Sequence, residues 1–202
     1  MTPLAQALLP LYRGYLRRLD EMVARIGEAA ALREPTARDE SQKLLRDENG
    51  FVVRFDVADS RSGETFEVHG AHADAPAQAE VRVGTVAFAL QPGNWEELAL
   101  RCAFSRPPAP EDLAAVAELL QAWTVLAAHG GFKGADQAQA PWTGRLHSAA
   151  VRIDGPEIVA TLDVGTCPPG AFDALAAALG AFAPDGASVE RVVIGGTPPE
   201  DS

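Results

Sequence analysis

Hydrophobic residues change their spacing along this chain of 202 residues, and that change limits the folds it can adopt. In residues 1–33 they recur every three or four positions, as on one face of a helix. Between residues 51 and 105 they alternate with polar residues, as in strands with one buried face. The helical spacing returns in residues 107–131. We therefore predict an α+β fold with an N-terminal helix and antiparallel β-hairpins, with the helices packed on one face.

The N-terminal residues predict one long amphipathic helix. Thr2 can cap it and Pro3 suits its first turn, whereas Pro10 predicts a kink or a restart because its ring clashes with the preceding turn. An apolar stripe of this kind either packs on a sheet or pairs with a second copy, so a homodimer through this helix is one expectation. Three residues of the helix are assigned to the predicted partner surface: Tyr12, Tyr15 and Leu19.

Alternating runs predict two hairpins in the first half of the chain. Residues 51–57 and 64–70 flank the turn "ADSRSG" and predict the first hairpin. Residues 80–90 and 95–105 flank "QPGN" and predict the second. Residues 33–50 are polar and contain a proline, so we interpret them as a linker.

The second half of the chain has a similar order of elements. Pro110 suits the first turn of a helix that two glycines, Gly130 and Gly131, bring to an end. A third hairpin is predicted over residues 145–165, and a helix that begins near Pro168 follows it. A last strand follows that helix.

Two parts of the chain share the order strand, double proline, helix: "RCAFSRPPAPEDL" and "LDVGTCPPGAFDAL". This indicates either a degenerate duplication of a hairpin-plus-helix unit or a common way for a chain to pass from strand to helix. We predict two similar subdomains within the following organisation: an N-terminal helix (1–33), an antiparallel sheet with a helix (51–131), a linker (132–144), a smaller ββαβ subdomain (145–196) and a tail (197–202).

The chain is acidic, with 17 Lys and Arg against 28 Asp and Glu and a net charge of −11. Residues 107–202 hold 12 of the acidic groups and 4 of the basic ones. Such a surface repels phosphate backbones and anionic lipids, so we expect no nucleic-acid and no membrane partner. It attracts positive charge, so we predict that the partner is another, basic protein. Solubility alone is the simpler explanation of the same charge.

The compartment follows from features that the chain lacks. Its two cysteines, Cys102 and Cys167, form no disulfide framework. The N-terminus has no basic region followed by the apolar run of a signal peptide, and no apolar stretch is long enough to cross a bilayer. We expect a cytoplasmic protein with reduced thiols.

Cys167 lies in "GTCPPGAFDAL", between a predicted strand and a predicted helix. At a helix N-terminus, backbone amides can lower the pKa of a thiol and make the cysteine reactive. Thiol catalysis also needs a base and oxyanion donors, and only His147 of the four histidines lies in the same segment. We interpret Cys167 as a turn residue, with a reactive thiol as the alternative.

Residues His69, His72 and Asp74 could supply three ligands to zinc or iron. They follow a predicted strand and lack the spacing of a helical H-E-x-x-H site, so a solvated loop is the preferred interpretation and a metal site the alternative. No complete glycine-rich phosphate motif occurs in the chain. We predict no cofactor.

Two aromatic residues, Phe132 and Trp142, lie within the second predicted linker. Trp142 follows Pro141 and could serve as an exposed anchor for a partner, so we add both aromatic residues to the predicted partner surface. Packing against their own domain is the alternative, because tryptophan is largely buried in most proteins.

The charge is the strongest indication of function, because no convincing catalytic set is present. We predict a non-catalytic, acidic protein-binding module that acts as an adaptor, a chaperone or an inhibitor. Its element order and acidity are similar to those of small secretion chaperones and of immunity proteins, which is a likeness of fold alone. Two alternatives stay open: an enzyme that uses Cys167 or the group His69, His72 and Asp74, and a structural subunit of an assembly.

Overall fold

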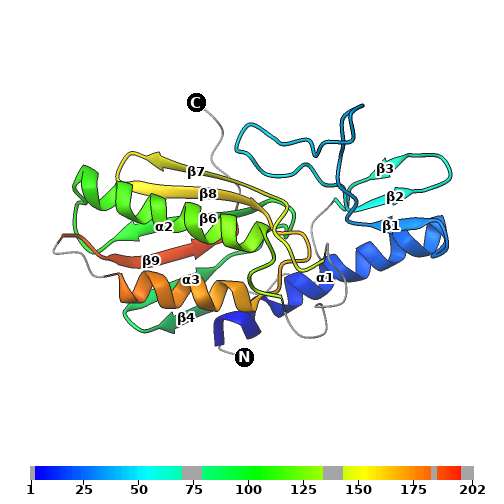
Figure 1. The fold of residues 1–202 in the computed structure, drawn as a ribbon. Helices are drawn as coiled ribbons and strands as arrows, with labels where there is room; N and C mark the ends of the chain where they lie inside the picture. Colours follow the sequence, from blue (N-terminus) through cyan, green and yellow to red (C-terminus); the bar gives the residue numbers. More distant parts are fainter. Residues whose placement is uncertain (1–2, 70–78, 134–142, 183–185, 197–202) are drawn as a thin grey trace.

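The computed structural model describes residues 3–69, 79–133, 143–182 and 186–196, and Figure 1 shows that they form an α+β fold. This described part of the chain contains three helices: α1 (Pro3–Ile26), α2 (Pro110–Ala128) and α3 (Gly170–Ala181). Among these residues, no helix is long and apolar enough to span a bilayer.

The larger of two sheets has six strands and is mixed. Across the sheet the strands are β4 (Ala79–Val83), β5 (Val86–Leu90), β9 (Val189–Ile194), β6 (Leu98–Phe104), β8 (Glu157–Asp163) and β7 (Ser148–Asp154). The β5–β9 pair is parallel and the other pairs are antiparallel. Helices α2 and α3 lie side by side on one face of this sheet (Figure 1). Strands from both predicted subdomains therefore share one sheet.

The strand pairing differs from the predicted one in two places. In the hairpin predicted from 51–57 and 64–70, Val57 pairs with Phe66 as expected, whereas Val52 and Arg54 bridge to Arg46 and Thr36. The hairpin within 145–165 is confirmed as β7–β8. The hairpin predicted from 80–90 and 95–105 is wrong, because β9 lies between β5 and β6. Residues 80–90 instead contain a complete hairpin, β4–β5, whose tight turn Gly84 allows with a φ of 59°. Alternation identifies strands but does not determine their partners.

Helix α1 connects the larger sheet to a small antiparallel sheet of β1 (Ala31–Arg33), β2 (Val57–Asp59) and β3 (Thr65–Phe66). Its buried stripe packs against β4 at one end and against β1 and β2 at the other (Figure 1). The helix continues through Pro10 and ends at Ile26, before the left-handed Gly27 with a φ of 94°. It is therefore shorter than the predicted helix.

Two tight hairpins, 38–44 and 46–52, occupy most of the segment predicted as a linker, 33–50. Each begins with Arg-Asp-Glu, so the segment is an internal repeat. In both copies the aspartate side chain accepts hydrogen bonds from backbone N–H groups of the turn. The repeat is hard to recognise from turn residues alone. The residue with left-handed backbone is Gly50 in hairpin 46–52 but Gln42 in hairpin 38–44, and only glycine is typical of that position.

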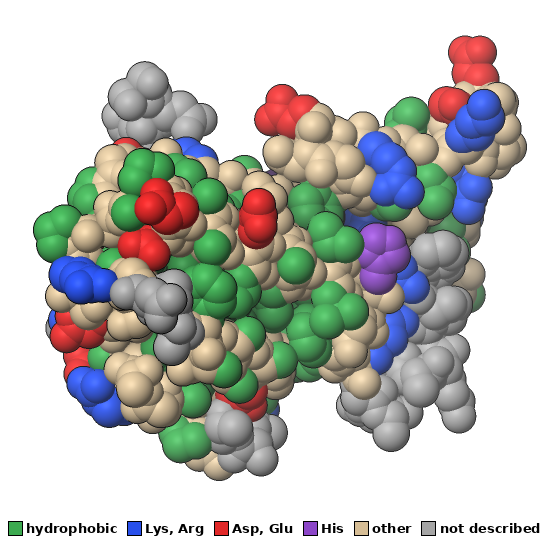
Figure 2. Space-filling view, turned by 60° about the vertical axis from the view of Figure 1, so that its left-hand side comes forward, with side chains coloured by type: hydrophobic (Ala, Val, Ile, Leu, Met, Phe, Trp, Pro, Cys, Tyr) green, Lys and Arg blue, Asp and Glu red, His purple; other side chains and the backbone are tan. Residues whose placement is uncertain are grey.

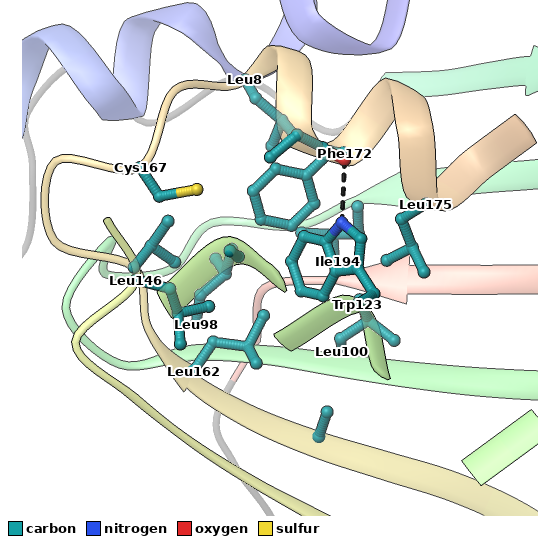
Figure 3. Packing of buried hydrophobic residues seen from close by; sticks show 14 of the residues in the cluster. Leu8, Leu98, Leu100, Trp123, Leu146, Leu162, Cys167, Phe172, Leu175 and Ile194 are labelled. Carbon is teal, nitrogen blue, oxygen red and sulfur yellow. Dashed lines mark hydrogen bonds between the residues drawn. The ribbon is translucent and has the colours of Figure 1, made fainter. Parts of the chain in front are cut away.

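The main core lies between the larger sheet and its helices, and aromatic side chains link the two layers (Figure 3). Trp123 of α2 donates its indole N–H to the Ala171 carbonyl at 2.9 Å, and its ring centroid lies 5.3 Å from that of Phe172. Trp95 packs on Phe172 as well, with ring centroids 5.8 Å apart, and donates to the Gly165 carbonyl at 2.8 Å. These contacts fix the positions of α2 and α3 on the sheet.

Candidate functional site

A buried polar cluster lies where the small sheet meets one end of the larger sheet. Glu34 follows β1, His147 precedes β7 and Thr166 follows β8, and all three are buried. The Glu34 Oε1 atom accepts hydrogen bonds from His147 Nε2 at 2.9 Å and from Thr166 Oγ1 at 2.6 Å. Glu34 Oε2 is buried without a hydrogen-bond partner in the described part of the chain. The cluster thus joins segments that are distant in the sequence.

A second carboxylate, Asp56, extends the cluster to helix α1. It accepts hydrogen bonds from the Tyr15 hydroxyl and from the Val68 backbone N–H, the latter at 2.5 Å. His147 Nδ1 lies 3.7 Å from Asp56 Oδ1 and 3.4 Å from Asp163 Oδ2. Carboxylates therefore face both nitrogens of the buried imidazole.

These carboxylates keep His147 protonated. Burial by itself would lower the pKa of His147, but Asp163 and Glu34 outweigh burial and hold this pKa well above its ordinary value. Burial also raises the pKa of Asp56, although His147 and Tyr15 act in the opposite direction. Burial and the neighbouring Asp56 together raise the pKa of Tyr15, so its hydroxyl stays a neutral donor. The cluster is an imidazolium held between carboxylates.

The backbone around this ion pair is unusual. Glu34 has a left-handed φ of 47°, which residues with a side chain rarely adopt. Gly165 has a φ of 52°, and a Cβ atom there would lie 2.4 Å from His147 Cδ2. Strained backbone persists only where the surrounding contacts determine it. The hydrogen bonds to the Glu34 carboxylate supply such contacts.

Beside the cluster lies a cavity of about 80 Å³ whose lining includes five basic side chains: Arg46, Arg54, Arg145, His129 and His147. The apolar part of its lining is formed by Phe51, Val52, Val125, Ala128 and Leu146. Arg54 is only 9% exposed. Burial and then the neighbouring Arg145 lower the pKa of Arg54, whereas Glu34 raises it. Like charges are therefore crowded around this cavity.

The cavity adjoins a shallow, open surface on the exposed face of helix α2, which we call the α2 groove. The groove is lined by Glu118, Gln121, Ala122, Val125, Leu126 and His129. Val125 and His129 line both the groove and the cavity, so the two lie next to each other. Val125 and Leu126 are 51% and 49% exposed, which is unusual for large apolar side chains that lie together. Figure 2 shows a hydrophobic area near the centre of this face, beside a histidine and basic side chains.

The acidic residues do not form one contiguous patch on the face shown in Figure 2, where they lie scattered among apolar and basic side chains. Several acidic side chains are internal, among them Glu34, Asp56 and Asp112. Asp112 accepts hydrogen bonds from the backbone N–H groups of Ala109 and Ala187, both at 3.0 Å. The net charge of −11 therefore overstates the negative charge that a partner would meet.

Cys167 is fully buried, and its sulfur points into the apolar cluster (Figure 3). Burial, together with the nearby Glu34, raises the pKa of this thiol to about 12. The N-cap of α3 is Pro169, so Cys167 does not occupy the position where helix amides would stabilise a thiolate. These observations favour the turn-residue interpretation over a reactive thiol.

The predicted metal ligands are placed only in part. His69 is exposed, and its carbonyl accepts a hydrogen bond from Arg18 at 2.9 Å. His72 and Asp74 lie outside the described residues, and so does Trp142. Within the described ranges, no three His, Cys, Asp or Glu side chains are grouped to hold a metal ion.

The predicted partner surface on α1 needs correction. Tyr15 and Leu19 are 0% and 2% exposed, so neither side chain has surface available for a partner. They belong to the stripe that packs inside this chain, which removes the reason to expect a homodimer through that stripe. Tyr12 and Phe132 are half-buried, and each packs against a tryptophan ring.

Sequence reasoning missed the polar cluster. Glu34 and His147 are 113 positions apart, and no local pattern indicates that they meet. The Arg-Asp-Glu repeat is a local signal that could have been noticed, because it places Arg46 beside the cavity. Comparison of the chain with protein-family models, with curated proteins and with solved structures finds no match.

Replacement of Glu34 by alanine should lower the free energy of unfolding by about 3–5 kcal/mol, because the buried His147 and Thr166 side chains both lose the carboxylate to which they are bonded. Urea unfolding of Glu34→Ala measures this loss. The control is Arg33→Ala, which breaks the exposed Asp20–Arg33 ion pair of 2.8 Å and should cost about 1 kcal/mol or less. Equal losses in the two variants would contradict a stabilising role of the buried pair.

Glu67 should make the protein less stable as the pH rises. Burial, followed by Asp56 and Asp163, raises the pKa of Glu67 from 4.5 to about 7. The folded state therefore binds more protons, and stability is lost between those two pH values. Relative to the wild type, Glu67→Gln should gain free energy of unfolding from pH 4.5 to pH 7 and keep that gain above pH 7.

The measurement is urea unfolding of both proteins across this pH range. Glu64→Gln removes an exposed carboxyl from the same hairpin and serves as the control. If the difference between Glu67→Gln and the wild type did not change with pH, the neighbouring carboxylates would not be acting on Glu67.

Proposed function

We propose that this protein is a non-catalytic protein-binding module that docks an apolar segment of its partner in the α2 groove, as an adaptor, a chaperone or an inhibitor would. The supporting observation is the pair of half-exposed apolar side chains, Val125 and Leu126, in a groove that adjoins a cavity. Large apolar side chains that are exposed together characterise interaction sites.

The fold does not require these two side chains. Helix α2 is held by its opposite face, where Val116, Leu120 and Trp123 are buried. Val125 and Leu126 lie outside that buried set, at the end of the helix nearest hairpin 46–52. Their exposure therefore has no evident role in stability, whereas a docked segment would cover them.

The buried cluster supports a structural role more than a catalytic one. His147 is 4% exposed, and both of its ring nitrogens face carboxylates of the same chain. The raised pKa of Cys167 argues against a thiolate nucleophile. The described residues thus give an enzyme less support than they give a binding protein.

A peptide selection tests the proposed function. Random peptides displayed on phage are selected on the folded protein, and enriched peptides are resynthesised for fluorescence anisotropy. We expect apolar peptides that lose at least tenfold in affinity when Val125→Asp is introduced, because that substitution places a charge in the groove.

The matched control is Ile153→Asp, which changes a side chain of similar exposure (49% against 51% for Val125) that lines neither the groove nor the cavity. This variant should bind like the wild type. Failure to select any peptide, or equal binding by Val125→Asp, would contradict the docking surface.

A further inference from the structure

We propose that the cavity at the end of the α2 groove is a carboxylate-binding site that takes an acidic side chain of the docked segment. This inference rests on the proposed function and names the chemistry of the partner. Arg46, Arg54 and Arg145 line the cavity, although the whole chain has a net charge of −11. Arginine remains charged at all ordinary pH values, and its planar group matches a carboxylate with two hydrogen bonds.

The size of the cavity limits what it can hold. An engineered apolar cavity of about 150 Å³ holds a benzene molecule, so a cavity of about 80 Å³ suits a group of a few atoms, such as a carboxylate. The apolar part of the cavity lining includes Val125, which also lines the groove. The remainder of the ligand would therefore lie along α2, over apolar surface. A carboxylate attached to an apolar segment fits both parts.

The described lining of the cavity includes three arginines and no aspartate or glutamate. Glu34 raises the pKa of Arg54, and one oxygen of Glu34 is already bonded to His147 and Thr166. Burial, followed by Arg145, lowers the pKa of Lys133, although Glu34 acts in the opposite direction. A bound carboxylate would relieve this crowding of positive charge.

The internal repeat fixes Arg46 before any ligand binds. Arg46 Nη1 donates to the Gly50 carbonyl at 2.6 Å within hairpin 46–52. In hairpin 38–44, Arg38 Nη1 makes the equivalent bond to the Gln42 carbonyl at 2.7 Å, but Arg38 does not line the cavity. The two arginines thus have the same local structure, and only one of them belongs to the proposed site.

The experiment compares Arg46→Gln with Arg38→Gln, using a selected peptide in a glutamate form, a glutamine form and a phosphoserine form. For the wild type we expect the glutamate form to bind about tenfold more tightly than the glutamine form. Arg46→Gln should reduce this ratio to about twofold or less, whereas Arg38→Gln should preserve it. The peptide comparison in the wild type needs no protein variant, so it stays decisive if a variant folds poorly.

Equal affinities of the glutamate and glutamine forms would overturn this inference and leave the docking surface intact, provided that Val125→Asp still abolishes binding. Tighter binding of the phosphoserine form would replace the carboxylate by a phosphate. Titration with propionate tests the cavity without any partner. Binding is followed by the chemical shifts of the arginine Nε–H signals in NMR spectra. Chemical shifts that saturate in the wild type and in Arg38→Gln, but not in Arg46→Gln, would support the carboxylate site. The absence of any shift in the wild type would overturn it.

Discussion

The arrangement of the two sheets depends on the ion pair between Glu34 and His147. The pair is fully enclosed, with N and O atoms 2.9 Å apart and side chains 0% and 3% exposed. Burial of two charges is costly, and such pairs often contribute more to a unique arrangement than to stability. Here the hydrogen bonds to Thr166 and the nearby Asp163 add to the pair. The small sheet, α1 and the ends of β7 and β8 are thereby held in one geometry.

That geometry creates the cavity, because its walls come from different parts of the fold. One wall belongs to hairpin 46–52 and the following residues up to Arg54, and the other belongs to the end of α2 and to residues 145–147. A change in the angle between the two sheets would separate these walls. The polar cluster therefore places the arginines, and the exposed face of α2 provides the apolar part of the same surface. We therefore assign the buried charges of the cluster to stabilising the fold, and the arginines at the cavity to binding the proposed partner.

Much of the fold was predictable from local patterns, and little of the site was. Helical spacing and the positions of Pro110, Gly130 and Gly131 indicate α2 closely, and alternation identifies most strands. Strand partners were not predictable, since alternation is the same whether β6 lies beside β5 or beside β9. The duplication of a hairpin-plus-helix unit stays a prediction. The cluster could not be predicted because Glu34, Asp56 and His147 meet only after the two sheets have assembled. The basic partner predicted from the net charge stays a prediction, and three of the carboxylates behind that charge are internal.

A distance measurement between hairpin 46–52 and helix α2 tests most directly whether the buried ion pair fixes the two sheets. Spin labels can be attached at Asn49→Cys and Gln121→Cys, which are exposed, while the native Cys102 and Cys167 are 0% exposed and should stay unlabelled. Double electron–electron resonance should give one narrow distance distribution. The distribution should broaden when Glu34→Ala is added, in samples whose circular dichroism still shows folded secondary structure. A broad distribution without that substitution, or a narrow one that Glu34→Ala leaves unchanged, would contradict the claim that the buried ion pair fixes the two sheets.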